Sequence, residues 1–182
     1  MKLLYVSLLT VALVSGYSGN PADYRKTEVT VADSIKKPYN GKKLNIGVIG
    51  SLNREFKNVT LHKEIPVSLR DKRTPYDAFF ITEEFFDELS KDKWSPVFAA
   101  SNTPVFFIAS EYDPFLFKMD GMDYSAFSPS ATEAVSGFAL DPDADDQAMQ
   151  GWGYGKPGQS KEKLPNWIFY SMFRDIESYA KQ

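Results

Sequence analysis

Four short, dense runs of apolar residues predict the strands of a buried sheet. They stand at Leu44–Ile49, Val59–Ile65, Ala78–Ile81 and Val105–Ile108. Each run is bounded by glycine, proline or polar residues and shows little of the alternation of a half-exposed strand. Strands with this pattern are buried on both faces, so the runs predict a mostly parallel sheet with helices on each side.

Helical patterns follow the later runs. Thr82 is predicted to cap a helix whose first turn holds Glu83 and Glu84, because acidic side chains suit the positive end of the helix dipole. A second short helix is predicted over residues 95–100, where a proline stands near the start. The stretch Asn166–Ala180 carries apolar residues at three- and four-residue steps, which is typical of an amphipathic helix packed on a sheet.

Two late strands complete the predicted domain. Ala134–Leu140 and Met149–Tyr154 flank an acidic loop and are interpreted as a β-hairpin. The whole pattern predicts a three-layer α/β domain with a mostly parallel sheet of about five strands, flavodoxin-like or Rossmann-like.

The connection Gly50–Asn58 conflicts with this prediction, because it has about nine residues and a helical crossover needs about a dozen. Either that crossover is a single helical turn, or the second run is not a parallel neighbour of the first.

Residues 1–16 predict an export signal. One lysine precedes the apolar run Leu3–Val14, which is too short for a membrane-spanning helix of about 20 residues, and small residues follow it. The alternative, a buried N-terminal helix, lacks a cap and an amphipathic pattern. The protein is therefore expected outside the cytoplasm, either secreted or attached to the outer face of the cytoplasmic membrane. Its only expected membrane contact is through this signal segment.

Residues 17–42 predict a tether between the signal and the domain. They are rich in glycine, proline, asparagine and alternating charges. Glu28–Ala32 within them could instead add an edge strand. The folded domain is then expected over residues 43–182, and the full length of 182 residues suits a single domain.

Composition limits the classes of function. The chain is 43% hydrophobic and 15% aromatic, which suffices for a globular core. A formal net charge of −3 provides no basic surface for phosphate backbones, so no nucleic-acid binding is expected. The absence of cysteine excludes disulfides, thiolate zinc sites and thiol nucleophiles. No cofactor is expected.

Four segments carry a resemblance to a known family. KKPYNGKKLNIGVIG, YDAFFITEEFFDELS, TPVFFIAS and GWGYG, in this order, resemble small exported lipoproteins of Gram-positive bacilli. The resemblance covers most of the chain from about Lys36 onward. It implies export and a small α/β domain, and it brings no catalytic residues. This chain departs from the family at the lipobox, because Tyr17 stands where the lipid-bearing cysteine would be.

The stretch KLNIGVIGS, residues 43–51, raises the question of a nucleotide site. A dinucleotide fingerprint needs three glycines that open a long helix, whereas no third glycine follows Gly47 and Gly50 here. Gly50 is therefore interpreted as a turn residue. His62, the single histidine, falls inside a predicted strand, and the chain contains no G-x-S-x-G, so a Ser-His-Asp hydrolase is not indicated.

Two further motifs have a functional and a plain interpretation. Asp141, Asp143 and Asp145 alternate as in a calcium loop, but the turn glycine and the final glutamate of such a loop are missing. Weak calcium binding is therefore the alternative to a solvated hairpin loop. The stretch Gly151–Gly155 could offer aromatic rings to a sugar, or it could simply pack in a sheet.

A sharper prediction places a ligand site at one edge of the sheet. Ligands of open parallel sheets bind beyond the carboxyl ends of the strands. The ligand-binding candidates at those ends are Ser51, Asn53, Glu83, Glu84, Ser110, Glu111 and Asp113. Together they would form an acidic, hydroxyl-bearing rim that prefers a cation, an amine or a polyol. The alternative is that they only cap helices and complement helix dipoles.

The sequence therefore favours a non-enzymatic exported binding domain for a small polar ligand or an envelope protein. The alternative is an envelope hydrolase or transferase that uses paired carboxylates among Glu83, Glu84, Glu111 and Asp113. Such an enzyme should show two carboxyls across a pocket, at least one with a shifted pKa. A third class, a protein-interaction module, should show a contiguous exposed apolar patch.

Overall fold

Within the described residues of the computed structural model, six strands form one sheet in the order β2-β1-β3-β4-β5-β6. The strands are β1 (Leu44–Ile49), β2 (Val59–Glu64), β3 (Ala78–Thr82), β4 (Val105–Ile108), β5 (Val135–Leu140) and β6 (Met149–Tyr154). The structure describes residues 35–71, 73–118, 130–141 and 148–181. The predicted signal, and the predicted edge strand at 28–32, lie outside these residues.

The sheet is mixed, which corrects the prediction of a mostly parallel one. β1 pairs in parallel with β2 and β3, and β3 pairs in parallel with β4. β5 runs antiparallel to both β4 and β6, so the predicted late hairpin is confirmed. The apolar pattern could not distinguish these cases, because β4 is buried on both faces although one of its neighbours is antiparallel.

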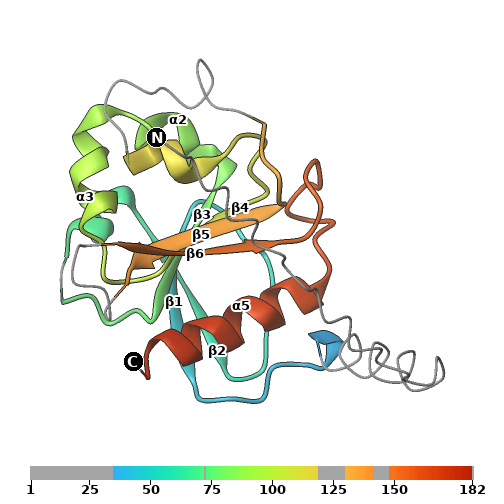
Figure 1. The fold of residues 1–182 in the computed structure, drawn as a ribbon. Coiled ribbons are helices and arrows are strands. Elements are labelled where there is room, and N and C mark those ends of the chain that lie inside the picture. The colour runs from blue at the N-terminus through green and yellow to red at the C-terminus, as the bar shows by residue number, and fades with distance from the viewer. Residues whose placement is uncertain (1–34, 72, 119–129, 142–147, 182) are drawn as a thin grey trace, which may run out of the picture. The chain divides into compact units, whose positions relative to one another are not determined.

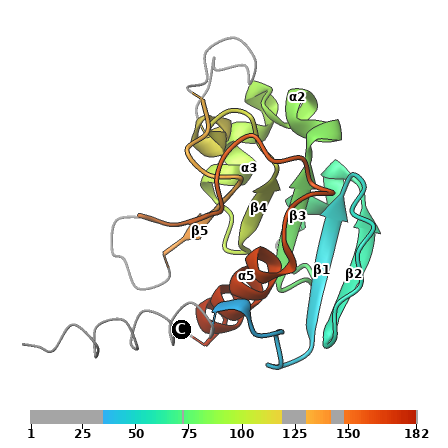
Figure 2. The ribbon, with the colours of Figure 1, turned by 90° about the vertical axis from the view of Figure 1, so that its right-hand side faces the viewer.

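Helices lie on both faces of the sheet, as Figures 1 and 2 show, so the α/β class is confirmed. The α-helices are α2 (Phe86–Leu89), α3 (Ser95–Ala99) and α5 (Asn166–Tyr179). Shorter 3-10 turns are η1 (Pro66–Arg70), η2 (Glu83–Phe85), η3 (Asp92–Trp94) and η4 (Pro114–Lys118). The C-terminal helix α5 is confirmed close to its predicted bounds. No helix among the described residues is long and apolar enough to cross a membrane.

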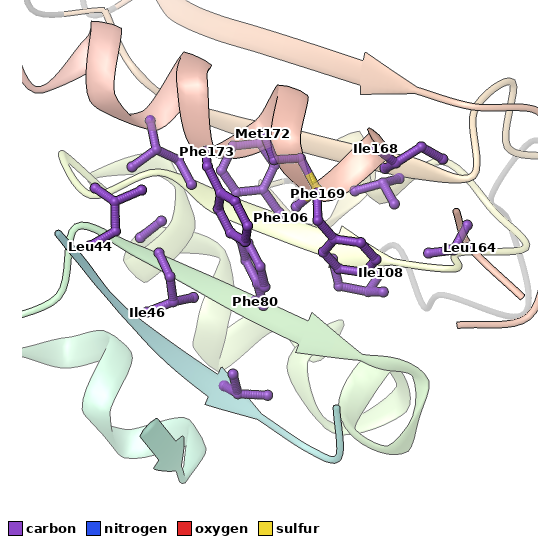
Figure 3. Packing of buried hydrophobic residues seen from close by; sticks show 14 of the residues in the cluster. Leu44, Ile46, Phe80, Phe106, Ile108, Leu164, Ile168, Phe169, Met172 and Phe173 are labelled. Atoms are coloured by element: carbon purple, nitrogen blue, oxygen red, sulfur yellow. The ribbon is translucent and has the colours of Figure 1, made fainter. Parts of the chain in front are cut away.

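The face of the sheet covered by α5 holds the larger buried cluster. The helix buries five apolar side chains at three- and four-residue steps: Ile168, Phe169, Met172, Phe173 and Ile176. Figure 3 shows Phe169, Met172 and Phe173 facing the sheet, where Phe80 and Phe106 lie. The rings of Phe80 and Phe173 stack with centroids 6.2 Å apart. Burying such a side chain contributes about 1.5–3 kcal/mol, so this face fixes α5 firmly.

The other face is covered by α2, α3 and η4. Its buried cluster includes Phe86, Phe98 and Phe107. The rings of Phe98 and Phe107 lie 5.7 Å apart, and Phe86 lies 5.9 Å from Phe107. The short helices are therefore held by aromatic packing on the sheet.

The connection between β1 and β2 contains no helix, yet the two strands are parallel neighbours. Both predicted alternatives for Gly50–Asn58 are therefore wrong. Extended chain advances about 3.3–3.6 Å per residue, so this segment can return along a strand of six residues without a helix. Its Phe56 packs against Phe169 and Phe173 of α5, with ring centroids 5.2 and 5.0 Å apart.

Tyr39, in the segment predicted as a tether, packs on the domain. Its side chain is 2% exposed. Its ring meets Phe173 edge-on at 5.6 Å, and its hydroxyl is hydrogen-bonded to the Glu177 carboxylate at 2.9 Å. The described unit thus begins before residue 43, at Ile35.

Candidate functional site at the carboxyl ends of β1 and β3

The strand order reverses between β1 and β3. The chain leaves β1 for β2 on one side and then crosses to β3 on the other side of β1. Ligands of open α/β sheets bind at such a point, beyond the carboxyl ends of the strands. The register pairs Ile49 with Ile81, so the residues after β1 and after β3 meet at the same edge.

Thr82 joins the two strand ends. Its side chain is fully buried, and its hydroxyl oxygen accepts a hydrogen bond of 3.2 Å from the Ser51 N–H. The same hydroxyl donates to the Glu84 carboxylate. Thr82 precedes η2 as predicted, but it makes no side-chain capping bond there, which corrects the predicted role. The hydroxyl donates its hydrogen bond to the Glu84 carboxylate instead.

Gly50 makes the close approach of these strand ends sterically feasible. Its φ of 110° lies in a region that side chains disfavour, and a Cβ there would stand 1.8 Å from Thr82 Oγ1. The interpretation of Gly50 as a turn residue is therefore confirmed. Its small size also leaves room for the Ser51–Thr82 hydrogen bond.

Lys161 brings a positive charge to this edge from the segment before α5. Its Nζ lies 3.0 Å from Glu83 and 2.6 Å from Glu84, and its side chain is 13% exposed. Burial opposes the ionisation of Glu84, but hydrogen bonds from Lys161 and Thr82 outweigh it and lower the pKa of Glu84 to about 2. Burial would likewise lower the pKa of Lys161, yet the bonds to Glu84 and Glu83 raise it.

Arg54 ties the β1–β2 connection to the same segment. Its guanidinium donates to Asn166 Oδ1 at 2.8 Å and to the backbone carbonyls of Lys161 and Glu162 at 2.8 and 3.0 Å. It also lies over the Phe169 ring, 4.6 Å from the centroid. Two cations thus fix the segment before α5 against the ends of β1 and β3.

A groove of about 670 Å³ opens beside these cations, and we call it the switch-point groove. One wall is residues 51–54 of the β1–β2 connection, and the other is residues 161, 162 and 164–166 before and at the start of α5. A smaller cavity of about 290 Å³ adjoins it and shares Ser51, Leu52 and Asn53. The chain thus places a concave surface where the strand order predicts a site.

The predicted residues divide between two places. The structure brings Ser51, Asn53, Glu83 and Glu84 together around the switch-point groove and the Lys161 ion pairs, while those that follow β4 diverge from them. Ala109 adopts a left-handed φ of 60° and turns the chain after β4. Ser110 is hydrogen-bonded to the Tyr112 carbonyl, and Glu111 is exposed.

Asp113 lines a separate cavity of about 420 Å³, together with Glu133, Lys118, Gly151 and Gly153. These two glycines belong to the stretch considered as a sugar platform, and Trp152 of the same stretch also lines the cavity, but the contacts of the Trp152 and Tyr154 side chains lie elsewhere. Trp152 contacts the Phe106 ring at 5.4 Å, and the Tyr154 hydroxyl donates to Asp175 at 2.6 Å. The rings therefore serve packing on the α5 side of the sheet.

No sequence pattern points to Arg54 or Lys161 as site residues. Both stand in short polar stretches that are typical of solvated loops, and Lys161 reaches a glutamate 77 positions away. Only the tertiary fold places their charges at the ends of β1 and β3.

Of the predicted calcium ligands, Asp141 is described, whereas Asp143 and Asp145 lie outside the described residues. No cluster of metal-ligating side chains is present in the part of the chain that the structure describes.

Comparison with known proteins identifies no relative. No protein-family model, curated protein or solved structure matches this chain. The resemblance to small exported lipoproteins stays a prediction that rests on the quoted segments.

Proposed function

We propose that this chain is an exported α/β domain that binds a small polar ligand in the switch-point groove and catalyses no reaction. The observation that carries the proposal is the position of the groove, at the reversal of strand order between β1 and β3. Its volume of about 670 Å³ suits a small molecule, since ligand pockets measure roughly 300–1,000 Å³. Leu52 and Leu164 offer apolar contact, while Ser51, Asn53 and Asn166 offer polar groups.

The walls of the groove are held in place without a ligand. Three hydrogen bonds from Arg54 join the β1–β2 connection to the opposite wall. The ion pairs of Lys161 fix that wall to the turn after β3. A preorganised site loses less conformational entropy on binding, which favours a binding role.

The alternative, a hydrolase or transferase with paired carboxylates, receives less support. Glu83 and Glu84 lie near one another, but Lys161 pairs with both. With a pKa of about 2, Glu84 stays ionised at neutral pH and has no proton to donate as a general acid. The cluster fits a structural ion network better than an acid–base pair.

A docking surface for an envelope protein is also less well supported. The large apolar side chains exposed among the described residues are Ile35, Ile65 and Val67. Scattered exposed apolar residues are normal on soluble domains and do not make a contiguous patch. A small polar ligand is therefore the proposed partner.

The location and the finer fold are parts of this proposal. Export is supported by the pattern of residues 1–16, and it places the domain outside the cytoplasm, secreted or held at the membrane by that segment. A flavodoxin-like or Rossmann-like relationship is supported by the order β2-β1-β3-β4, which matches the start of the doubly wound order 2-1-3-4-5.

A thermal-shift screen with a blocked groove tests the binding role. The panel contains divalent cations, amines, sugars, cell-wall fragments, nucleotides and small carboxylates. A ligand at about a hundred times its Kd adds roughly 2.7 kcal/mol, which moves the melting midpoint by several degrees. Asn53→Trp should fill the groove and remove the shift, because Asn53 is exposed and lines it.

Glu55→Trp is the matched control for this screen. Glu55 is also exposed and belongs to the same connection, but it does not line the groove. The proposal expects this variant to keep the ligand-induced shift. The proposed function would be contradicted if no compound of the panel shifts the melting midpoint, or if the shift survives Asn53→Trp.

A further inference from the structure

Arg54 is a cation whose hydrogen bonds all go to uncharged oxygen atoms. The acceptors are the side-chain amide oxygen of Asn166 and two backbone carbonyls. None of the ion pairs among the described residues includes Arg54. Its guanidinium is half-buried over the Phe169 ring, at the wall of the switch-point groove.

This placement leaves a positive charge that the protein only partly compensates. Burial lowers the pKa of Arg54, and the charge of Glu162 only partly opposes the effect. A partly desolvated guanidinium gains most from an anion, and its planar array of N–H donors matches the oxygens of a carboxylate or a phosphate. Three of its five N–H groups are used, so others remain for a ligand.

The acidic groups near the groove form no ion pair with Arg54. Glu83 and Glu84 are paired with Lys161. Glu162 is the one carboxylate among the described residues that line the groove or the adjoining cavity. Its carboxylate accepts hydrogen bonds from its own backbone N–H and from Ser160, which lower its pKa. Lys63 adds a further positive charge in the adjoining cavity.

We propose that the ligand of the switch-point groove carries an oxyanion, a carboxylate or a phosphate group, that binds to Arg54. This inference rests on the proposed function and names the chemistry of its ligand. It reverses the sign of charge expected from the sequence, which favoured a cation, an amine or a polyol. The change follows from Lys161, which pairs with both Glu83 and Glu84, and from Arg54, which the sequence did not single out.

A ¹H–¹⁵N NMR titration of the full chain with inorganic phosphate, and separately with acetate, tests the inference. Chloride keeps the ionic strength constant, so that general screening does not change during the titration. The expected result is a saturable shift of the backbone amides of Ser51, Asn53 and Asn166. Tighter binding of phosphate would indicate a phosphate ester as the ligand, and tighter binding of acetate would indicate a carboxylate.

Two variants of Arg54 give the decisive comparison. Arg54→Gln should weaken the affinity for the bound anion at least about tenfold, because the charge is lost. Arg54→Lys keeps the charge but loses the planar fork, so it should give an intermediate affinity. A dispersed amide spectrum confirms that each variant is folded. If Arg54→Gln does not fold, the affinity of Arg54→Lys tests the inference instead.

Arg70→Gln is a closely matched control. The Arg70 guanidinium also lies 4.6 Å from a ring centroid, that of Trp94, and donates to a backbone carbonyl, that of Lys93. Arg70 does not line the groove, so its loss should leave anion binding unchanged. If the loss of any stacked arginine weakens anion binding, Arg54→Gln and Arg70→Gln should lose affinity equally. That result would contradict the inference.

Two other results would overturn the inference. The first is no saturable shift at the groove with either anion, and the second is unchanged affinity in Arg54→Gln. If the thermal-shift screen then finds a neutral or cationic ligand that Asn53→Trp blocks, the proposed function holds and only the anion inference is wrong. If no ligand of any class binds in the groove, both are wrong.

Discussion

The ammonium nitrogen of Lys161 lies 2.6 Å from a carboxylate oxygen of Glu84, although 77 positions separate the two residues. The pair joins the segment before α5 to the turn after β3. The Glu84 carboxylate in turn accepts a hydrogen bond from the Thr82 hydroxyl, and the hydroxyl oxygen of Thr82 accepts one from the Ser51 N–H. One chain of polar contacts thus links the ends of both strands to a wall of the groove.

Lys161→Met should destabilise the protein by about 1–2 kcal/mol at neutral pH, because it leaves two carboxylates without their cation. The pKa of Glu84 is lowered from 4.5 to about 2 in the folded state. Its stabilisation is therefore present above pH 4.5 and lost as the pH falls toward 2. The variant should lose less stability over that range than the wild type, as urea unfolding at pH 7 and pH 3 will measure.

The control for this substitution is Lys181→Met. Lys181 pairs with Glu177 at 3.0 Å, but its side chain is 69% exposed. Exposed pairs of this spacing contribute only about 0.3–0.5 kcal/mol. An equal effect of the two substitutions would contradict the role given to Lys161.

Gly50→Ala should destabilise the protein by more than about 2 kcal/mol, since it combines a strained φ with a clash against Thr82. Gly158→Ala separates the two causes. Gly158 also has a positive φ, of 79°, but a Cβ there meets nothing within 4 Å. Gly158→Ala should therefore lose only about 1 kcal/mol of stability, from the strained backbone conformation. Equal losses of the two variants in urea unfolding would show that the clash with Thr82 is unimportant.

A second pair of glycines tests the packing of the late hairpin. A Cβ on Gly137 would stand 2.3 Å from the Phe106 ring, whereas one on Gly151 would meet nothing closer than 3.9 Å. Gly137→Ala should therefore destabilise the domain by roughly 1–3 kcal/mol through overpacking. Gly151→Ala should be neutral or stabilise it by up to about 1 kcal/mol, through the entropy of the unfolded chain. Thermal unfolding that ranks the two the other way would contradict this packing.

Tyr154→Phe should destabilise the protein by about 1.5–3 kcal/mol at neutral pH, because Asp175 loses a hydrogen bond of 2.6 Å. Burial, and next the bond to Asp175, raise the pKa of Tyr154. The neutral phenol is thus favoured by folding, and its stabilisation is lost as the pH rises above the ordinary tyrosine pKa of about 10. The variant should lose less stability than the wild type between pH 9 and 11, which circular dichroism in urea can measure; identical losses would exclude this role.

The strands could be predicted because the apolar pattern that marks each strand lies in its own residues and needs no distant partner. β1 and β4 have the bounds that the apolar runs predicted, since dense apolar stretches end sharply at glycine, proline or polar residues. The direction of β5 was harder to predict, because burial on both faces does not encode the direction of a neighbouring strand. The extended connection after β1 was missed because Phe56 finds its partners only on α5, over a hundred positions later.

The site was predictable only in part, for a similar reason. Ser51, Asn53, Glu83 and Glu84 follow directly from the strand ends. Lys161 and Arg54, which set the charge of the groove, come from segments whose sequence resembles solvated loops. Lys161 reaches both acids only through tertiary contact, so the charge around the groove could not be inferred from the acids alone.

Locating the first ligand that the thermal-shift screen identifies decides whether the switch-point groove is a binding site. Amide chemical shifts of the full chain, recorded with and without that ligand, report which residues it contacts. A ligand bound in the groove should cause the largest shifts at residues 51–54 and at Asn166. The largest shifts at Glu133, Gly151 and Gly153, around the separate cavity, or at the exposed Ile65 and Val67, would contradict it.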